Sequence, residues 1–359
     1  MDFKFERVFK GPGFAETLFL GTSGGRRIIR KASNPDALPF SRTALVREIR
    51  LLRGLPDTLR PFFPDLIRTN LEDEPEDSPE LPDVIFYDMP YYPPEEGWVT
   101  LSDCLLEGSI SAEGARAVLG EIVDTAFTCF RIDPKTPAED YAERTMLVSI
   151  RESIGWAKRA PAFRPLIDER RLVINGRPVR GALELAEWFG DTGRVREVLT
   201  PSRDRFLHGD FFPENILYNR ETGRWKLLDP VSVRGVFRGD FVFDLNKMDD
   251  WLSGELPALR LGRFTVRISG NTVDFDVHTN VENLRNLNGL GVSEWYRERL
   301  KGGAYGDVFA EEPGWEARWL FVKAFYCFCM LPLADSSQAV ARYILALRCM
   351  DEFLEAAGG

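Results

Sequence analysis

The sequence predicts an α+β protein with two lobes: a small lobe of antiparallel strands, then a larger, mainly helical lobe with added hairpins. Three observations support this fold class. Residues 1–92 alternate short apolar runs with glycine-containing turns and hold one helical stretch. A proline-rich connector follows at Pro93 and Pro94. Residues 93–359 are dominated by apolar positions at helical spacing, interrupted by hairpin signals.

The first strands surround a glycine-containing loop. Residues 8–20 hold two apolar runs separated by Gly11 and Gly13, a G-x-G pattern with no third glycine at position 16. Glycine lets backbone N–H groups approach phosphates without a clash from Cβ. An ordinary hairpin turn explains the same pattern equally well. The loop therefore becomes a candidate phosphate site only in combination with the elements that follow.

Residues 26–32 predict the next strand, which carries a basic side chain beside an apolar one. Side chains alternate between the two faces of a strand, so Ile29 and Lys31 share one face. If the register is shifted by one residue, Arg30 takes the place of Lys31. A solvated basic edge strand is the structural alternative.

A helix is expected from Ser41, as its N-cap, to Gly54. Leu45 and Leu52 recur at helical spacing, and Glu48 lies three residues after the first and four before the second, so it faces inward with them. A buried carboxylate needs a partner because an unpaired one is costly. Lys31 on the preceding strand is the obvious partner, with a surface-exposed glutamate as the alternative.

The remaining elements follow from turn signals and periodicity. The acidic run 72–80 predicts a solvated loop, and residues 84–92 predict a strand that leads into the connector. In the second lobe, Asn175-Gly176 and Gly270-Asn271 each predict a hairpin. The expected helical segments are about 111–131 (capped by Ser111), 138–160, 181–199, 281–301, 315–332 and 336–356.

The stretch from His208 to Asn219 is the strongest candidate for chemistry. Asp210 is followed five positions later by Asn215, and then by two short apolar runs around a glycine-containing turn, the second ending in Asp229. A hairpin of this kind brings the three oxygen-bearing side chains together. Hard cations such as Mg2+ prefer such ligands, usually one or two from the protein with phosphate oxygens.

This spacing resembles the catalytic loop and metal-binding aspartate of the kinase fold, H-R-D-x-x-x-x-N followed by D-F-G. With Gly209, the loop is similar to the H-G-D-x-x-x-x-N form of the aminoglycoside phosphotransferase and choline kinase family. The resemblance implies a bilobal protein-kinase-like fold and an ATP- or GTP-dependent kinase. It further implies that Asp210 accepts the proton of an attacking hydroxyl, while Asn215 and Asp229 hold Mg2+ on the nucleotide phosphates. A polar surface hairpin with incidental acids is the structural alternative.

The resemblance also assigns a nucleotide site to the first lobe. The glycines would approach the phosphates, the lysine would contact the α- and β-phosphates while paired with the glutamate, and the isoleucine would lie over the base. The end of the last strand would form a hinge whose backbone hydrogen-bonds the purine. The implied set is Gly11, Gly13, Ile29, Lys31, Glu48, Asp88, Met89 and Tyr91.

After Asp229 the chain departs from protein kinases. Pro230 follows in place of Phe-Gly, and no A-P-E segment appears later, which argues against a protein kinase. Asp240 and Asp244 match the G-D-x-x-x-D-L segment of the small-molecule branch and are expected to be scaffold, with Asp240 capping the next helix. His208 is expected to brace the loop.

The acceptor is expected to be a hydroxyl of a small molecule, most simply a sugar or sugar-like compound. An aminoglycoside or choline-type amino alcohol is the alternative, and a non-catalytic nucleotide-binding module is the alternative from another class. Asp249 and Asp250 are candidates to meet an amino group, although solvated helix-surface acids explain them as well. The sequence leaves the oligomeric state open.

Composition sets limits on the class of protein. The net charge of -10 argues against a general nucleic-acid binder, and 44% hydrophobic with 28% charged residues is typical of a globular chain. The first residues lack the apolar run of a secretion signal, and the most apolar stretch, 319–331, contains Lys323 and is too short to span a membrane. Five cysteines without zinc-finger spacing indicate free thiols in a reducing cytoplasm. Two histidines exclude a His-rich metal site.

Overall fold

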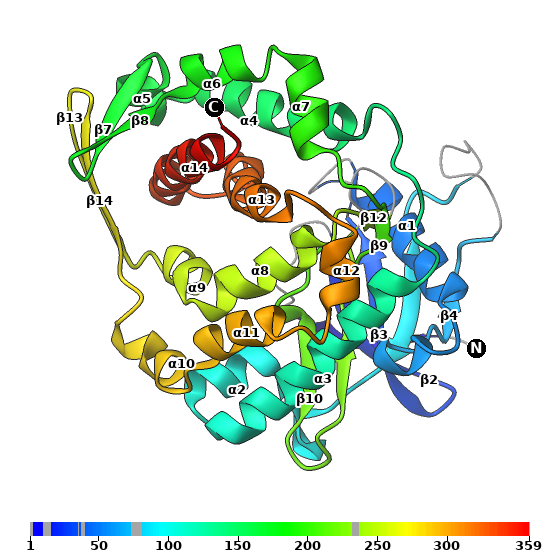
Figure 1. Cartoon of the computed structure of the whole chain (residues 1–359). Helices are drawn as coiled ribbons and strands as arrows, with labels where there is room; N and C mark the ends of the chain where they lie inside the picture. Colours follow the sequence, from blue (N-terminus) through cyan, green and yellow to red (C-terminus); the bar gives the residue numbers. More distant parts are fainter. Residues whose placement is uncertain are drawn as a thin grey trace. The chain divides into compact units, whose positions relative to one another are not determined.

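The computed structural model (Figure 1) describes residues 3–9, 16–34, 36, 40–72, 81–231 and 237–358. The chain forms two compact units. The first combines Met1–Cys104 with His208–Phe237, and the second combines Leu105–Leu207 with Arg238–Gly359. The units are therefore not consecutive along the chain, whereas the sequence suggests a single division after residue 92. The predicted α+β class, with an antiparallel sheet first and a helical region later, is confirmed.

The first unit is built on a five-stranded antiparallel sheet with the order β1-β2-β3-β5-β4. Its strands are β1 (Lys4–Phe9), β2 (Glu16–Ser23), β3 (Arg26–Ser33), β4 (Arg68–Thr69) and β5 (Phe86–Pro90). Helix α1 (Ser41–Gly54) contacts β3 and buries Leu45, Ile49 and Leu52, as its periodicity predicts. The predicted cap is wrong: Ser41 is the first helical residue, Phe40 precedes it, and no side chain of the described residues caps this end.

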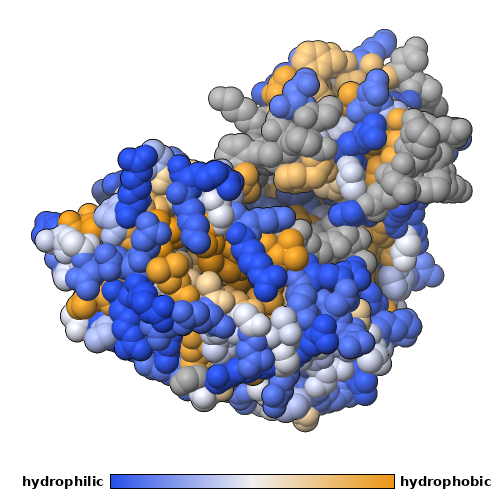
Figure 2. All heavy atoms as spheres, turned by 90° about the horizontal axis from the view of Figure 1, so that it is seen from above, coloured by the Kyte–Doolittle hydropathy of each residue, from blue (hydrophilic) through white to orange (hydrophobic). Residues whose placement is uncertain are grey.

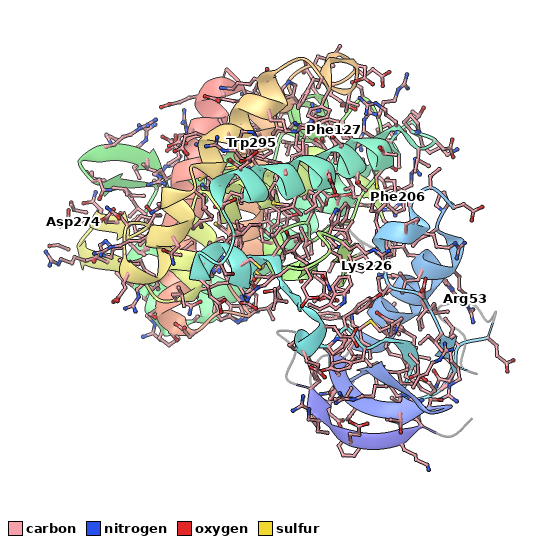
Figure 3. All side chains as sticks on the ribbon, turned by 90° about the horizontal axis from the view of Figure 1, so that it is seen from below. Arg53, Phe127, Phe206, Lys226, Asp274 and Trp295 are labelled. Atoms are coloured by element: carbon pink, nitrogen blue, oxygen red, sulfur yellow. The ribbon has the colours of Figure 1, made fainter. Side chains whose placement is uncertain are left out.

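A three-stranded antiparallel sheet completes the first unit, in the order β11-β10-β6. The predicted hairpin after Asn215 is confirmed as β10 (Ile216–Asn219) and β11 (Trp225–Leu227), and β6 (Trp98–Thr100) pairs with β10. Lys226, labelled in Figure 3, donates to the carbonyl oxygens of Pro61 and Phe63 at 2.6 and 3.0 Å. These bonds attach the hairpin to the segment that follows α1.

Helices dominate the second unit, where α13 packs against α14 (Figure 1). Ser111 caps α3 as predicted, because its hydroxyl accepts from the Gly114 N–H at 3.1 Å. The stretch predicted as 281–301 is broken by Gly291, whose φ of +58° ends one helix and begins the next. Stretches 138–160 and 181–199 are likewise subdivided. The helices are α2 (Leu101–Glu107, which begins in the first unit), α3 (Ala112–Arg131), a π-helical turn (Glu143–Leu147), α4 (Val148–Arg159), α5 (Arg164–Ile167), α6 (Ala182–Trp188), α7 (Thr192–Leu199), α8 (Val242–Leu252), α9 (Glu255–Arg260), α10 (Arg285–Gly289), α11 (Val292–Lys301), α12 (Gly306–Ala310), α13 (Trp315–Cys329) and α14 (Ser336–Ala356).

The two predicted hairpins of the second unit join into one four-stranded sheet. They are β7 (Arg171–Ile174) with β8 (Arg177–Arg180), and β13 (Phe264–Ser269) with β14 (Thr272–Val277), and β7 pairs in parallel with β14. Asn175, with a φ of +50°, forms the predicted turn with Gly176. Its side chain also exchanges two hydrogen bonds with the Phe275 backbone, at 2.7 and 2.8 Å. One turn residue thus links both hairpins.

All five cysteines are free, and four of them are buried, as the sequence predicts. In the part of the chain that the structure describes, no helix is long and apolar enough to cross a membrane. Phe127 of α3, labelled in Figure 3, stacks on Tyr305 with 3.8 Å between ring centroids. On the face shown in Figure 2, hydrophobic residues gather in a hollow surrounded by hydrophilic ones.

Candidate active site

The register of the five-stranded sheet decides which side chains share a face. Ile29 pairs with Met89, and Lys31 pairs with Tyr87. Because directly paired residues of an antiparallel sheet project from the same face, these four side chains lie together. The predicted common face of Ile29 and Lys31 therefore follows from the register, and Tyr87 joins them there.

Arg30 and Asp88 belong to the opposite face. The guanidinium of Arg30 forms a bidentate ion pair with Asp88, at 2.8 and 3.0 Å, and Arg68 donates to the same carboxylate at 3.1 Å. Asp88 is fully buried, and its carbonyl oxygen accepts from the Ile67 N–H. In this register the side chains of Arg30 and Asp88 lie away from the face of Lys31, and Lys31 is the residue that contacts Glu48 and Asp229.

Lys31 is the centre of a buried polar cluster. Its Nζ donates to Glu48 Oε2 at 2.7 Å and to Asp229 Oδ1 at 2.5 Å. The Tyr87 hydroxyl donates to the second oxygen of Glu48 at 2.9 Å. Lys31 and Glu48 are only 5% and 3% exposed. The partner predicted for Glu48 is therefore observed, and residues far apart in the sequence meet at one ammonium group.

Burial and charge act in opposite directions within this cluster. Burial alone would lower the pKa of Lys31, but the carboxylates of Asp229 and Glu48 outweigh it and raise that pKa well above its usual value. Burial raises the pKa of Glu48 to about 7, even though Lys31 opposes the shift. Lys31 also holds the pKa of Asp229 below its usual value against the effect of burial. Asp229 is thus kept ionised beside a permanently charged lysine.

The loop that starts at His208 fixes Asp210 and Asn215 relative to each other. The Asn215 Nδ2 group donates to Asp210 Oδ2 at 2.9 Å and to the Asp210 carbonyl oxygen at 3.0 Å. The Leu228 N–H donates to the Asn215 carbonyl oxygen at 2.8 Å. Since Asp229 follows Leu228, this bond ties the loop to the third residue of the set.

Gly209 allows the loop to approach the segment after Asp229 very closely. Its φ is +84°, and a Cβ at this position would lie 1.8 Å from the Val231 carbonyl oxygen. The Val231 N–H donates to the His208 carbonyl oxygen at 2.8 Å across this contact. Asp229 itself has a φ of +57°, a conformation that aspartate tolerates better than most residues. The glycine of the H-G-D sequence is therefore a packing requirement.

His208, the first residue of the loop, is buried beside the rings of Phe63 and Phe211. It is 4% exposed, and the ring of Phe63 lies 6.1 Å away in a stacked orientation. Burial lowers the pKa of His208 to about 4, although the nearby charges of Asp210 and Asp229 oppose the shift. The neutral ring accepts from the Asp210 N–H through Nδ1 at 3.4 Å. This position agrees with a bracing role.

The donor set is suited to Mg2+ in its usual partnership with phosphate. Among the described residues, no group of three or more His, Cys, Asp or Glu side chains is arranged to hold a metal alone. The amide nitrogen of Asn215 donates to Asp210, so its amide oxygen is the atom that could bind a cation. The Asp229 side chain is ionised and 38% exposed. One or two protein oxygens of this kind are typical for Mg2+, which takes its other ligands from water and phosphate.

The remaining predicted nucleotide residues are placed as follows. Gly11 and Gly13 lie outside the described residues. Met89 is buried beside Ile29. Tyr91 follows β5, its ring 6.1 Å from that of Phe9 and under the guanidinium of Arg27. Two residues of the Lys31 face were missed, Tyr87 and Glu16; the alternation along β5 and β2 would have found both.

In the second unit, the acids considered for the acceptor are paired with cations. Asp240 is fully buried and bonded to Arg318 at 2.5 Å, and it accepts from the Val242 N–H, so the scaffold role predicted for it is observed. Asp249 is bidentate to Arg297, at 2.7 and 3.2 Å. Asp250 lies 3.4 Å from Lys323. Asp244 is buried in α8. A hollow of about 420 Å³ near the end of α8 is lined by Leu252, Ser253, Thr279, Asn280, Leu287, Asn288, Gly291, Val292, Ser293, Glu294 and Arg297.

Comparisons with known proteins place the chain near one group of solved structures. No family model and no curated protein matches the sequence. The chain is similar to the aminoglycoside phosphotransferase APH(4)-Ia in ternary complex with AMP-PNP and hygromycin B, with 12% identity, coverage of 99% of this chain and 96% of that one, and a TM-score of 0.49. A proposed aminoglycoside phosphotransferase from Ralstonia eutropha JMP134 shows 14% identity, coverage of 98% and 92%, and a TM-score of 0.49.

Proposed function

We propose that this protein transfers the γ-phosphate of ATP or GTP to a hydroxyl group of a small molecule. One observation carries the proposal: Lys31 is hydrogen-bonded to Glu48 and Asp229, and Asn215 is hydrogen-bonded both to Asp210 and to the residue preceding Asp229. A phosphoryl transfer requires these groups, namely a cation for phosphate charge, oxygen ligands for a metal and a carboxylate for the acceptor proton.

Each residue has a defined task in this reaction. Lys31, held by Glu48, neutralises charge on the nucleotide phosphates. Asp210 accepts the proton of the acceptor hydroxyl as the oxygen bonds to the γ-phosphorus and the bond to the β-phosphate oxygen breaks. Asn215 fixes the orientation of Asp210 because it donates to both its carboxylate and its carbonyl. Positioning and electrostatics are the main requirements of phosphoryl transfer, so few groups suffice.

Asn215 and Asp229 are the residues that would hold Mg2+. When bound, the ion would neutralise charge on the β- and γ-phosphates and orient them. Lys31 lowers the pKa of Asp229, so the Asp229 carboxylate is available as a ligand near neutral pH. Lys31 would contact the phosphates through its ammonium group while Glu48 holds its side chain in place.

The acceptor that we favour is a sugar or sugar-like compound, with an aminoglycoside or amino alcohol as the second candidate. The net charge of -10 favours a neutral or cationic acceptor over an anionic one. The acids Asp240, Asp249 and Asp250 do not help to distinguish the two, because each is paired with an arginine or lysine.

The decisive variant is Asp210→Asn, tested for nucleotide binding and for turnover separately. We expect Mg2+–ATP to bind with nearly unchanged affinity by calorimetry, because Asp210 is not assigned to the nucleotide. Turnover should fall by about 10²- to 10⁴-fold, the usual contribution of a general base. Turnover is measured as ADP release across a panel of sugars, aminoglycosides and amino alcohols, so the same assay identifies the acceptor.

Asp57→Asn is the matched control, since it removes the same charge from a fully exposed side chain of the same unit. It should leave both binding and turnover unchanged. Full activity of Asp210→Asn would contradict its role as base. Nucleotide binding without ADP release on any acceptor would instead indicate a non-catalytic nucleotide-binding module.

A further inference from the structure

Glu16 is a charged residue of the candidate site to which the proposed reaction gives no task. It is the first residue of β2 and pairs with Ser33, two positions along the strands from the pair of Leu18 and Lys31. Side chains two residues apart on a strand share a face, and paired residues share it as well. Glu16 therefore projects from the face that carries Lys31.

Glu16 belongs electrostatically to the Lys31 cluster. Burial raises the pKa of Glu16, the positive charge of Lys31 opposes this shift, and the negative charge of Asp229 adds to it. Glu16 in turn contributes to raising the pKa of both Lys31 and Glu48. Three carboxyl groups thus act electrostatically on one ammonium group, so acidic side chains outnumber cations in the cluster before any ligand arrives.

Acidic side chains that outnumber cations are unexpected where a triphosphate is to bind. Position 16 also follows Gly11 and Gly13 at the place where a G-x-G-x-x-G sequence would have its third glycine. Glu48 is paired with Lys31 and Tyr87, and Asp229 has a task as a metal ligand, so both carboxylates have an explanation. Glu16 has none within the proposed reaction.

We propose that Glu16 is a specificity residue that makes the site select the Mg2+-bound nucleotide over the metal-free nucleotide. The inference rests on the proposed function, because it concerns which form of the nucleotide the same site accepts. At neutral pH the metal-free triphosphate carries about four negative charges and the Mg2+ complex about two, so a fixed carboxylate repels the first about twice as strongly. Glu16 thereby discourages unproductive binding of a nucleotide that lacks its metal.

The test is the affinity of Glu16→Gln for ATP with excess EDTA and, separately, with saturating Mg2+, measured by calorimetry. The repulsion free energy is proportional to the charge of the ligand. If the Glu16 carboxylate weakens binding of the metal-free form about tenfold, it therefore weakens binding of the Mg2+ form, with half the charge, about threefold. We therefore expect Glu16→Gln to bind metal-free ATP about tenfold more tightly and the Mg2+ complex at most about threefold more tightly. The preference for the Mg2+ form should therefore be smaller in Glu16→Gln than in the wild type. This difference should be smaller at high salt, because screening weakens the repulsion.

Glu6→Gln is the control, since Glu6 is a partly exposed acid of β1 in the same sheet, paired with Arg27 at 3.4 Å. It should leave both affinities unchanged. Equal changes of the two affinities in Glu16→Gln, or no change in either, would overturn the role of Glu16. An unchanged unfolding midpoint shows that the variant is folded. If wild-type protein binds neither form of the nucleotide, the proposed function fails together with the inference, whereas an unchanged preference in a nucleotide-binding protein refutes Glu16 alone.

Discussion

Replacing Gly209 with alanine tests whether the catalytic loop depends on its close approach to Val231. The new Cβ would lie 1.8 Å from the Val231 carbonyl oxygen, and a backbone atom cannot rotate away as a side chain can. The contact must therefore open, which breaks the 2.8 Å hydrogen bond from the Val231 N–H to His208. The loop that carries Asp210 should be displaced.

The expected loss of stability has two parts. Alanine at positive φ costs about 1–2 kcal/mol. Opening the contact removes the hydrogen bond to the carbonyl oxygen of buried His208, at about 1–3 kcal/mol. We expect Gly209→Ala to lower the free energy of unfolding by about 2–5 kcal/mol, and the upper end of this range is a size that single substitutions reach only through defined mechanisms. Displacing Asp210 by about 1 Å should also lower turnover by about 10²-fold.

Gly223→Ala separates the two parts. Gly223 has a φ of +70° in the same unit, but no atom of the described residues lies within 4 Å of the position that its new methyl group would take. The substitution should cost only the conformational term, about 1–2 kcal/mol. Urea unfolding followed by tryptophan fluorescence would compare the variants. A free energy of unfolding for Gly209→Ala within about 1 kcal/mol of that for Gly223→Ala would refute the steric explanation.

Two further predictions concern the same unit. Lys31→Met should weaken binding of Mg2+–ATP by about 10- to 100-fold in calorimetry, since a charge-assisted hydrogen bond contributes about 1.5–3 kcal/mol. Arg30→Met should leave that affinity unchanged and lower stability, because it removes a partner of buried Asp88 on the opposite face of the sheet. The pKa of His208 is about 4 in the folded protein against about 6.5 when unfolded. The stability that depends on a neutral His208 is therefore fully present above pH 6.5, and the free energy of unfolding decreases by about 3 kcal/mol as the pH falls toward 4. Urea unfolding at several pH values should show this loss in the wild type and not in His208→Asn.

The pairing of Lys31 with Glu48 could be predicted from the sequence because the strand and the helix each have a clear periodicity. The strand alternation fixes the face of Lys31, and the helical spacing of Leu45 and Leu52 turns Glu48 inward. A buried carboxylate then requires a cation, and Lys31 lies on the inward face of the preceding strand. The short hairpin before Asp229 was accessible for a similar reason, since its turn residues are local signals.

Features that depend on pairing between strands far apart in the chain could not be predicted from the sequence. Nothing local in residues 171–180 indicates that β7 would pair in parallel with β14, about a hundred residues later. The partners of the Asp88 side chain are a second example. The Asp88 carboxylate binds Arg30 and Arg68. Only the register of β3, β4 and β5 reveals that these three side chains meet on the face of the sheet opposite Lys31.

His208 shows why proximity to a reactive carboxylate does not by itself make a residue part of the chemistry. The negative charges of Asp210 and Asp229 favour a protonated ring, yet burial prevails and lowers the pKa of His208 to about 4. Only the neutral ring can accept from the Asp210 N–H, because a protonated imidazole has no acceptor nitrogen. Protonation would therefore remove a support of the loop without placing a proton near the transferred phosphate. A loss of activity at acid pH that follows the loss of stability, and that is absent from His208→Asn, would identify the histidine as a brace and leave proton transfer to Asp210 alone.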